Sequence, residues 1–253
     1  MEKKLSGKVA VVTGGTANIG RLFAEALADD GADLVVHYNS PRRSQEAEAV
    51  LGDLKARGAE ALAHQGDLTA PGQIAAPVDA AIARFGRWDI LVNTAGIIVR
   101  KPLAETTEQE YDASFAINAK IPFFLMAEAS RRMADDGRIV NLVTTQVAVT
   151  AATYSAYAGS KAPVEHFTKA FAKEVGPRGV TVNCIAPGPQ KTNFFYDVET
   201  DETIAWLKSM TISGDLGEPK DIVPVMRFLV APETRWVTAQ TVYCNGGMIS
   251  PVN

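Results

Sequence analysis

The chain has 253 residues and a mass of 27.0 kDa, a size that a single hydrophobic core can organise. Hydrophobic residues make up 47% of the chain and charged residues 21%, which excludes a disordered chain, a collagen-like fibre and a small disulfide-stapled scaffold. The net charge is −4 at pH 7 and the basic residues are scattered, so a nucleic-acid partner is not expected.

Short β-branched runs alternate with longer segments of helical periodicity along the whole chain. The runs predict strands at residues 9–12, 34–37, 61–64, 89–92, 138–143, 180–185 and 240–244. The periodic segments predict helices at residues 21–30, 44–57, 71–85, 108–119 continuing to 133, 154–175 and 219–229. This alternation implies βαβ crossovers and an α/β protein whose parallel sheet is covered on both faces.

A (β/α)8 barrel has a similar length and alternation, so the pattern alone does not separate a barrel from an open sheet. The turn after the first strand is more informative, because residues 13–20 read Thr-Gly-Gly-Thr-Ala-Asn-Ile-Gly. Small residues there let the backbone approach a pyrophosphate, and the following helix offers free N–H groups at its N-terminus. The turn therefore favours a nucleotide bound at the carboxyl edge of an open sheet.

The order and spacing of several short motifs resemble the short-chain dehydrogenase/reductase family. They are Thr13-Gly14 with Asn18-Ile19-Gly20, then Asn93-Thr94-Ala95-Gly96, Asn118, Thr144, Tyr157 with Lys161, and Asn183 to Gly188. The resemblance extends from Gly7 to Gly247. It implies a single doubly wound parallel sheet (a Rossmann fold) with helices on both faces. The expected organisation is one NAD(P)-binding domain over residues 1–253, with a substrate lid at about residues 189–215.

The resemblance also implies an NAD(P)-dependent oxidoreductase, similar to 3-oxoacyl-carrier-protein reductases, that acts on C=O and CH–OH groups. Tyr157 is then the proton donor for carbonyl reduction, and Lys161, one helical turn further on, is placed to lower its pKa. Thr144 aligns with the family's catalytic serine and keeps its hydroxyl, with Thr145 as an alternative. Asn118 would hold a water that links Lys161 to solvent.

By the same resemblance, cofactor-binding residues are distributed over the whole sheet edge. They are Gly14, Thr16, Asn18, Ile19, Gly20, His37, Tyr38, Asn39, Ser40, Arg42, Asp67, Leu68, Asn93, Ala95, Gly96, Tyr157, Lys161, Pro187, Gly188 and Thr192. Two positions depart from the family pattern. Asn18 replaces the middle glycine, but Asn tolerates positive φ; Thr94 replaces a second Asn and can still hydrogen-bond to backbone.

The end of the second predicted strand bears on the choice of cofactor. Residues 37–43 contain no carboxylate to bind a ribose 2′-hydroxyl. Ser40 and either Arg42 or Arg43 suit a 2′-phosphate, so NADP(H) is favoured over NAD(H). Against this, Ala17 stands where NADP-preferring relatives often carry a basic residue.

Aromatic residues after the sixth predicted strand indicate where a small-molecule substrate would bind. The candidate substrate-contacting residues are Gln146, Pro189, Phe194, Phe195 and Trp206. In the family that the chain resembles, loops in this segment set substrate specificity. The expected function is NADPH-dependent reduction of a ketone or 3-oxoacyl group to an alcohol. Alternatives are an NAD-dependent alcohol dehydrogenase and a non-catalytic cofactor-binding sensor or scaffold.

The sequence also bears on metals, membranes, compartment and assembly. His37, His64 and His166 lack metal-ligand spacing, so no metal is expected. Two cysteines, a polar N-terminus and no apolar run of membrane length favour a cytoplasmic protein without a membrane partner.

The helices predicted at 108–133 and 154–175 resemble the family's dimer interface, and residues 236–249 resemble its second contact. This resemblance implies a homotetramer, a dimer of dimers.

Overall fold

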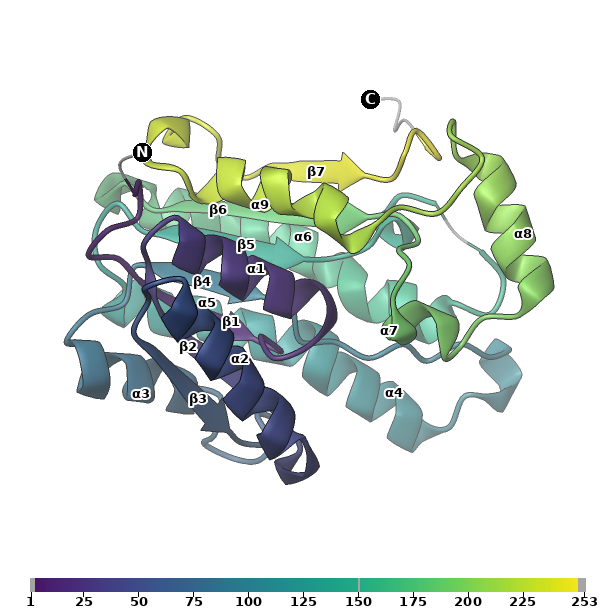
Figure 1. The fold of residues 1–253 in the computed structure, drawn as a ribbon. Coiled ribbons are helices and arrows are strands. Elements are labelled where there is room, and N and C mark those ends of the chain that lie inside the picture. The colour runs from purple at the N-terminus through teal and green to yellow at the C-terminus, as the bar shows by residue number, and fades with distance from the viewer. Residues whose placement is uncertain (1–2, 150, 250–253) are drawn as a thin grey trace.

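In the computed structural model, which describes residues 3–149 and 151–249, seven strands form one sheet. They are β1 (Val9–Thr13), β2 (Asp33–Tyr38), β3 (Ala61–Gln65), β4 (Ile90–Asn93), β5 (Arg138–Leu142), β6 (Thr181–Pro187) and β7 (Thr241–Cys244). Their order is β3-β2-β1-β4-β5-β6-β7, and every neighbouring pair is parallel. The strands therefore all end at the same edge of the sheet (Figure 1).

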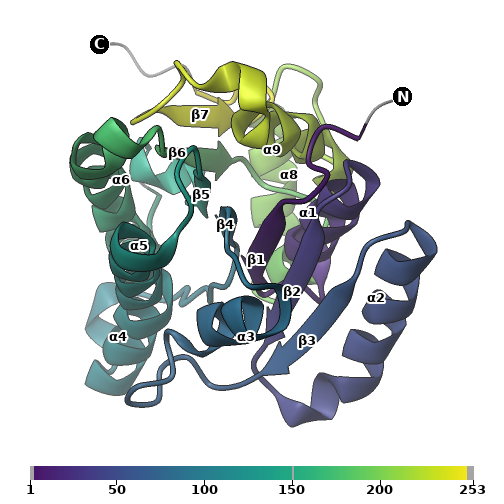
Figure 2. The same ribbon diagram turned by 90° about the vertical axis from the view of Figure 1, so that its left-hand side faces the viewer.

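The described part of the chain also contains nine α-helices. They are α1 (Asn18–Asp29), α2 (Ser44–Ala56), α3 (Ala76–Phe85), α4 (Glu108–Phe115), α5 (Ile121–Arg132), α6 (Ser155–Val175), α7 (Asn193–Tyr196), α8 (Asp201–Met210) and α9 (Val223–Val230). Helices α1, α2 and α9 cover one face of the sheet, and α3, α5 and α6 cover the other, as the end-on view shows (Figure 2). The open, doubly wound sheet with helices on both faces is confirmed, and the barrel alternative is wrong because β3 and β7 are edge strands.

The hydrophobic core is divided between the two faces of the sheet. All five residues of β1 are buried, as expected for a central parallel strand. One cluster packs side chains of α1, α2 and α9 against the sheet, including the fully buried Phe23 and Leu27. The other packs α3, α5 and α6 against the opposite face around Trp88, which is also fully buried. This two-sided burial fixes the strand ends that form the site.

The predicted strands are all present, but three predicted helices differ from the structure. The helix predicted at 219–229 is a 3-10 helix over Pro219–Ile222 and an α-helix only from Val223. The helix predicted at 71–85 begins at Ala76. Gly72 has a left-handed φ of 76°, which is not helical. Pro77 has no N–H to donate to an earlier turn, so it fits only in the first turn of a helix. The helix predicted at 108–133 contains a π-helical turn at Ala116–Lys120. Pro122 cannot donate the N–H that an α-helix would give to the carbonyl of Asn118, and the turn widens there.

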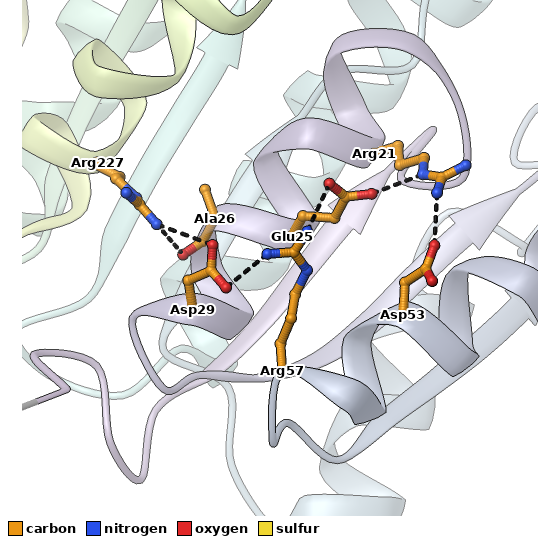
Figure 3. A network of polar contacts seen from close by, with 7 residues as sticks. All are labelled: Arg21, Glu25, Ala26, Asp29, Asp53, Arg57 and Arg227. Atoms are coloured by element: carbon orange, nitrogen blue, oxygen red, sulfur yellow. Dashed lines mark hydrogen bonds and ion pairs between the residues drawn. The ribbon is translucent and has the colours of Figure 1, made fainter.

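A chain of ion pairs joins helices on the α1 face of the sheet (Figure 3). The Arg57 guanidinium, which follows α2, lies 2.7 Å from Asp29 and 3.2 Å from Glu25 on α1. Arg21 on α1 contacts Asp53 on α2 at 2.6 Å. Arg227 on α9 reaches Asp29 at 3.3 Å. These side chains are between 16% and 50% exposed, so each ion pair adds little to stability.

Helices α7 and α8 lie outside this layered arrangement, beyond the carboxyl ends of β6 and β7 (Figure 1). A backbone bridge between Gln190 and Gly217 closes the segment that carries them. Within residues 3–149 and 151–249, no helix is both long and apolar enough to span a bilayer.

Candidate active site

A cleft of about 870 Å³ runs along the carboxyl edge of the sheet. Most of the predicted cofactor residues line it: Gly14, Thr16, Asn18, Ile19, Gly20, His37, Tyr38, Asn39, Ser40, Asp67, Leu68, Ala95, Gly96, Tyr157, Lys161, Pro187, Gly188 and Thr192. The predicted Thr144, Gln146, Pro189, Phe194 and Phe195 line it too. The topology thus brings residues from across the chain together between the β1 turn and α7.

Four predicted site residues do not line this cleft in the described part of the chain. The Asn93 side chain is buried and donates to Asn141 Oδ1 at 2.7 Å, so it supports the sheet. Trp206 is half-exposed on α8, and its neighbour Leu207 faces the cleft instead. Arg43 lines the cleft, whereas Arg42 does not. Asn118 does not line it either and is fully buried.

The glycine-rich turn after β1 holds a conformation that only certain residues allow. Gly14 has a φ of 65° and Asn18 a φ of 47°, so the predicted tolerance of Asn at this position is confirmed. A Cβ on Gly20 would lie 2.2 Å from the Gly14 oxygen, so no other residue fits there. The N-cap of α1 is Ala17, whose methyl group cannot cap, so the first-turn N–H groups remain free for a ligand.

His37 at the end of β2 fixes this turn against the neighbouring loop. Its Nδ1 accepts from the Gly14 N–H at 3.4 Å, and its Nε2 lies 2.8 Å from the Gly66 carbonyl oxygen. Burial lowers the pKa of His37 to about 4, so the ring is neutral near pH 7. Nε2 then carries the proton, because the other nitrogen accepts.

Thr94 secures the loop after β4 against β1. Its hydroxyl donates to the Thr13 carbonyl oxygen, and its N–H donates to the Thr13 hydroxyl at 3.1 Å. The adjacent Ala95 N–H lies 3.2 Å from the same hydroxyl. The predicted hydrogen bonding of Thr94 to backbone is confirmed, and Ala95 and Gly96 are left facing the cleft.

Tyr157 and Lys161 lie one turn apart on the same buried face of α6. The Lys161 ammonium donates to the Leu142 carbonyl oxygen at 2.8 Å, which ties α6 to the end of β5. A Cβ on Gly96 would lie 3.3 Å from Lys161 Nζ and 3.1 Å from Asn118 Oδ1. Backbone of the β4 loop therefore packs directly against both polar side chains.

The two threonines after β5 have different partners. Thr144 lines the cleft, its hydroxyl accepts from the Gln146 N–H at 3.3 Å, and it acts to lower the pKa of Tyr157. The Thr145 hydroxyl donates to the Ala186 carbonyl oxygen on β6 at 3.3 Å. Of the two, Thr144 is the one placed beside Tyr157.

Asn118 is completely buried in the π-helical turn. Its Oδ1 accepts from the Ile97 N–H at 3.0 Å, and its Nδ2 donates to the Ile97 carbonyl oxygen at 2.9 Å and to Ser160 at 3.0 Å. The side-chain amide thus pairs with the loop after β4 as a strand would. It holds the backbone beside Lys161 in place.

The pKa values at this site are set mainly by burial. Burial raises the pKa of Tyr157 to about 12 against the opposing hydrogen bond to Thr144. Burial also lowers the pKa of Lys161 to about 8. The expected lowering of the Tyr157 pKa is therefore wrong for this structure: the phenol is protonated at neutral pH, and so is most of Lys161.

The substrate end of the cleft is lined by the segment after β6. Thr192 caps α7 by accepting from the Phe195 N–H at 3.3 Å. Phe195 packs with Leu207 and Leu216 in a separate small cluster, with Met248 against it. Sequence reasoning missed Tyr154, Glu199, Leu207 and Met248 in the lining. Only Tyr154 had a signal, since it lies three residues before Tyr157 and one helical turn away.

Comparison with known proteins identifies the family. A family model described as enoyl-(acyl carrier protein) reductase matches residues 14–249. A short-chain type dehydrogenase/reductase of Picea abies is 37% identical over 97% of this chain and 93% of its own. The chain belongs to the short-chain dehydrogenase/reductase family. As a member of that family it is an oxidoreductase.

Two further members of the short-chain dehydrogenase/reductase family carry information about cofactors. A chloroplastic NADPH-dependent aldehyde reductase-like protein of Arabidopsis thaliana is 36% identical over 97% of this chain and 95% of its own. A putative dehydrogenase of Burkholderia cenocepacia, solved with bound NADP, is 41% identical with a TM-score of 0.94, over 99% of this chain and 96% of that one.

Proposed function

We propose that this short-chain dehydrogenase/reductase reduces a ketone or aldehyde to an alcohol with NADPH, using Tyr157 as the proton donor. The observation that carries the proposal is the buried group of Thr144, Tyr157 and Lys161 in one cleft with the glycine-rich turn. Each of the three occupies the position that the family resemblance gives it. This arrangement also argues against a non-catalytic sensor, which has no need of a buried proton donor.

The residues present fit a dinucleotide along the nucleotide end of the cleft. The uncapped first turn of α1 would bind the pyrophosphate with its free N–H groups. By the family resemblance, Asp67 and Leu68 would contact the adenine and Thr192 the carboxamide; all three residues line the cleft. The bound cofactor would supply the hydride for the carbonyl carbon.

Tyr157 and Thr144 act on the carbonyl oxygen in this proposal. Negative charge develops on that oxygen during reduction, and the Tyr157 hydroxyl donates a hydrogen bond and then its proton. With a pKa of about 12 the phenol is protonated at neutral pH, as a proton donor must be. The Thr144 hydroxyl donates to the same oxygen and orients it.

Lys161 and Asn118 support this proton transfer in different ways. The Lys161 ammonium is positive below its pKa of about 8 and stabilises the negative charge that forms on Tyr157 when the proton leaves. Asn118 holds the Ile97 backbone, and with it the wall beside Lys161. Asn118 is thus a positioning residue in this proposal, and the water that it was expected to hold stays a prediction.

A phosphate on the ribose would meet Ser40 and Arg43 in the cleft. Arg43 is about half-exposed, and its weak contact with Glu46 at 3.9 Å leaves the guanidinium available. The NADPH named for the Arabidopsis relative and the NADP bound to the Burkholderia dehydrogenase support the same cofactor here. We assign the role to Arg43 in place of Arg42.

The substrate end favours a compact and largely apolar carbonyl compound. Phe194, Phe195, Leu207 and Met248 form its apolar wall. Asp197 also lines this end and is exposed, so a carboxylate or phosphate on the substrate would be disfavoured beside it. Residues 189–215 serve as the lid over this end in the proposal. A 3-oxoacyl thioester on a carrier is the bulkier alternative.

A fluorescence titration with NADPH and NADH tests the cofactor assignment. We expect the wild type to bind NADPH more tightly than NADH. Arg43→Ala should lose about tenfold or more in NADPH affinity, since a charge-assisted contact is worth about 1.5–3 kcal/mol. The same variant should keep its NADH affinity. Arg42→Ala is the matched control, with the same charge removed one residue away. Preference for NADH would point to the NAD-dependent alcohol dehydrogenase, and binding of neither would contradict the enzyme proposal.

We also propose that the chain assembles through its exposed aromatic surfaces. Tyr111 on α4 and Phe123 and Phe124 on α5 are about half-exposed, on the elements expected at the dimer interface. Trp236 is 89% exposed beside β7, in the expected second contact. Light scattering should give a homotetramer, and Trp236→Ser a dimer. A wild-type monomer would contradict the assembly.

A further inference from the structure

Three side chains from distant parts of the chain meet at the substrate end of the cleft. Arg100 follows β4, Tyr154 precedes α6, and Glu199 lies between α7 and α8. The Glu199 side chain is 0% exposed and that of Arg100 is 18% exposed. Arg100 Nη1 lies 3.1 Å from Glu199 Oε2, and the Tyr154 hydroxyl donates to Glu199 Oε1. We call these three residues the lid clamp.

Arg100 contacts the lid segment at three points. Besides Glu199, Nη1 donates to the Val198 carbonyl oxygen at 3.0 Å and Nη2 donates to the Thr203 hydroxyl at 2.9 Å. The guanidinium carbon also lies 5.4 Å from the centre of the Tyr154 ring. One side chain outside the lid thus holds the turn between α7 and α8 and the start of α8.

The lid clamp is costly to bury, which points to a role beyond packing. A buried carboxylate and guanidinium lose their hydration, and their pairing offsets that cost only in part. Glu199 Oε2 has the ion pair with Arg100 but accepts no hydrogen bond within residues 3–149 and 151–249. Arg100 Nε donates no hydrogen bond within the same residues. Burial and Glu199 raise the pKa of Tyr154, so its hydroxyl stays protonated and remains a donor to Glu199.

The lid clamp ends directly beside the proton donor. The ring centres of Tyr154 and Tyr157 are 6.4 Å apart, and Tyr154 and Glu199 both line the cleft. Glu199 therefore fixes the Tyr154 ring through its hydroxyl, and this ring forms part of the wall that a substrate would meet next to Tyr157. Arg100 balances the Glu199 charge on the side away from the cleft, since Arg100 itself is not in the lining.

We propose that Glu199 and Arg100 are specificity-determining positioning residues. They fix the tip of the lid against the start of α6 and so limit how far a substrate extends beyond its reacting carbonyl. The substrate-length part of this inference rests on the proposed function; the attachment of the lid does not. The base of the lid is held separately, by the Gln190–Gly217 bridge and by Lys191, which lies 2.9 Å from Asp215 and 2.8 Å from Glu218.

Hydrogen exchange of the protein without cofactor tests the attachment directly. Arg100→Met and Glu199→Gln should exchange the amides of residues 193–210 at least tenfold faster than the wild type, while amides of β1, β4 and β5 stay equally protected. Glu202→Gln is the matched control, because Glu202 is exposed on α8, three residues further on. Unchanged lid exchange in both variants would overturn the clamp. Tyr154→Phe, which removes one hydroxyl, replaces either variant that fails to fold.

Kinetics with straight-chain aldehydes of increasing length test the specificity. Glu199→Gln and Tyr154→Phe should raise KM for the shortest aldehydes at least fivefold, change kcat less than twofold, and extend activity to longer chains. An equal loss of kcat at every length would overturn the specificity role and indicate a purely structural one. If the wild type reduces no carbonyl compound, the proposed function fails, while the exchange result still decides the clamp.

Discussion

The two ends of the cleft are constructed in different ways. The nucleotide end consists of backbone and small residues at the carboxyl ends of β1, β2 and β4, which the sheet holds in register. The substrate end consists of large side chains on and around α7 and α8, which lie outside the sheet. A bridge closes the segment that carries these helices, and a buried ion pair with Arg100 holds it. The first end is therefore fixed by the fold, and the second is free to vary while the fold stays the same.

Tyr157 stands where the two ends meet, and its replacement should have the largest effect. Tyr157→Phe removes the proton donor and should lower kcat by about 100-fold to 10,000-fold. NADPH affinity should stay within about twofold, because the nucleotide end is unchanged. Steady-state kinetics and a cofactor titration measure the two quantities. Undiminished turnover would contradict the assigned role.

The nucleotide end should tolerate no side chain at Gly20. A Cβ there would lie 2.2 Å from the Gly14 oxygen and 2.5 Å from the Thr94 hydroxyl, so Gly20→Ala must displace the turn. NADPH affinity, measured by fluorescence titration, should fall by about 100-fold, the scale on which a displacement of about 1 Å acts.

Gly52→Ala is the matched control for that substitution. Gly52 lies inside α2, and a methyl group added there would have no neighbouring heavy atom within 4 Å in the described part of the chain. The variant should bind NADPH normally and gain about 0.5–1 kcal/mol of stability in thermal unfolding. Equal cofactor binding by both variants would show that the turn is not the phosphate site.

The pH dependence of reduction should report Lys161. The ammonium is charged below its pKa of about 8 and neutral above it. Since the positive charge favours proton release from Tyr157, kcat/KM for reduction should be level below pH 8 and then fall. The tyrosine itself stays protonated up to about 12 and does not contribute to this decline. A level profile up to pH 10.5, the ordinary pKa of lysine, would contradict the lowered pKa of Lys161.

The smallest effect is expected from the ion pairs on the outer face of α1 and α2. Arg57→Met removes contacts with Asp29 and Glu25, but Arg57 remains about one-third exposed to solvent. The free energy of unfolding should fall by less than about 1 kcal/mol, and activity should not change. Chemical denaturation measures the first quantity. If Arg57→Met lost more free energy of unfolding than Arg100→Met, the exposed ion pairs would matter more to stability than the lid clamp, which would contradict this prediction.

The sequence predicted the nucleotide end better than the substrate end, for a physical reason. Glycines, Asn18 and Thr94 act through local backbone geometry, and the Tyr157–Lys161 spacing follows from one helical turn, so short motifs reveal them. The choice between Arg42 and Arg43 stayed open, with Arg42 named among the cofactor residues, because the spacing in a turn does not tell which side chain lines the cleft.

The residues that sequence reasoning missed depend on contacts between distant segments. Glutamate is usually exposed, so nothing in the sequence around Glu199 marks it as buried. Its partner Arg100 lies 99 positions earlier in the chain, and only the fold brings the two together. Trp206 was expected to contact substrate because it is aromatic, yet the turn of α8 directs Leu207 inward. The pKa of Tyr157 rises because of burial, which a motif does not specify.

Transfer of deuterium from NADPH tests the central proposal most directly. The protein would be incubated with an aldehyde and NADPH that carries two deuterium atoms at the reactive carbon of the nicotinamide ring, and the product analysed by mass spectrometry. Reduction by this enzyme predicts an alcohol with one deuterium on the former carbonyl carbon, formed far more slowly by Tyr157→Phe. No alcohol from any member of an aldehyde and ketone panel, or an unlabelled alcohol, would contradict the account.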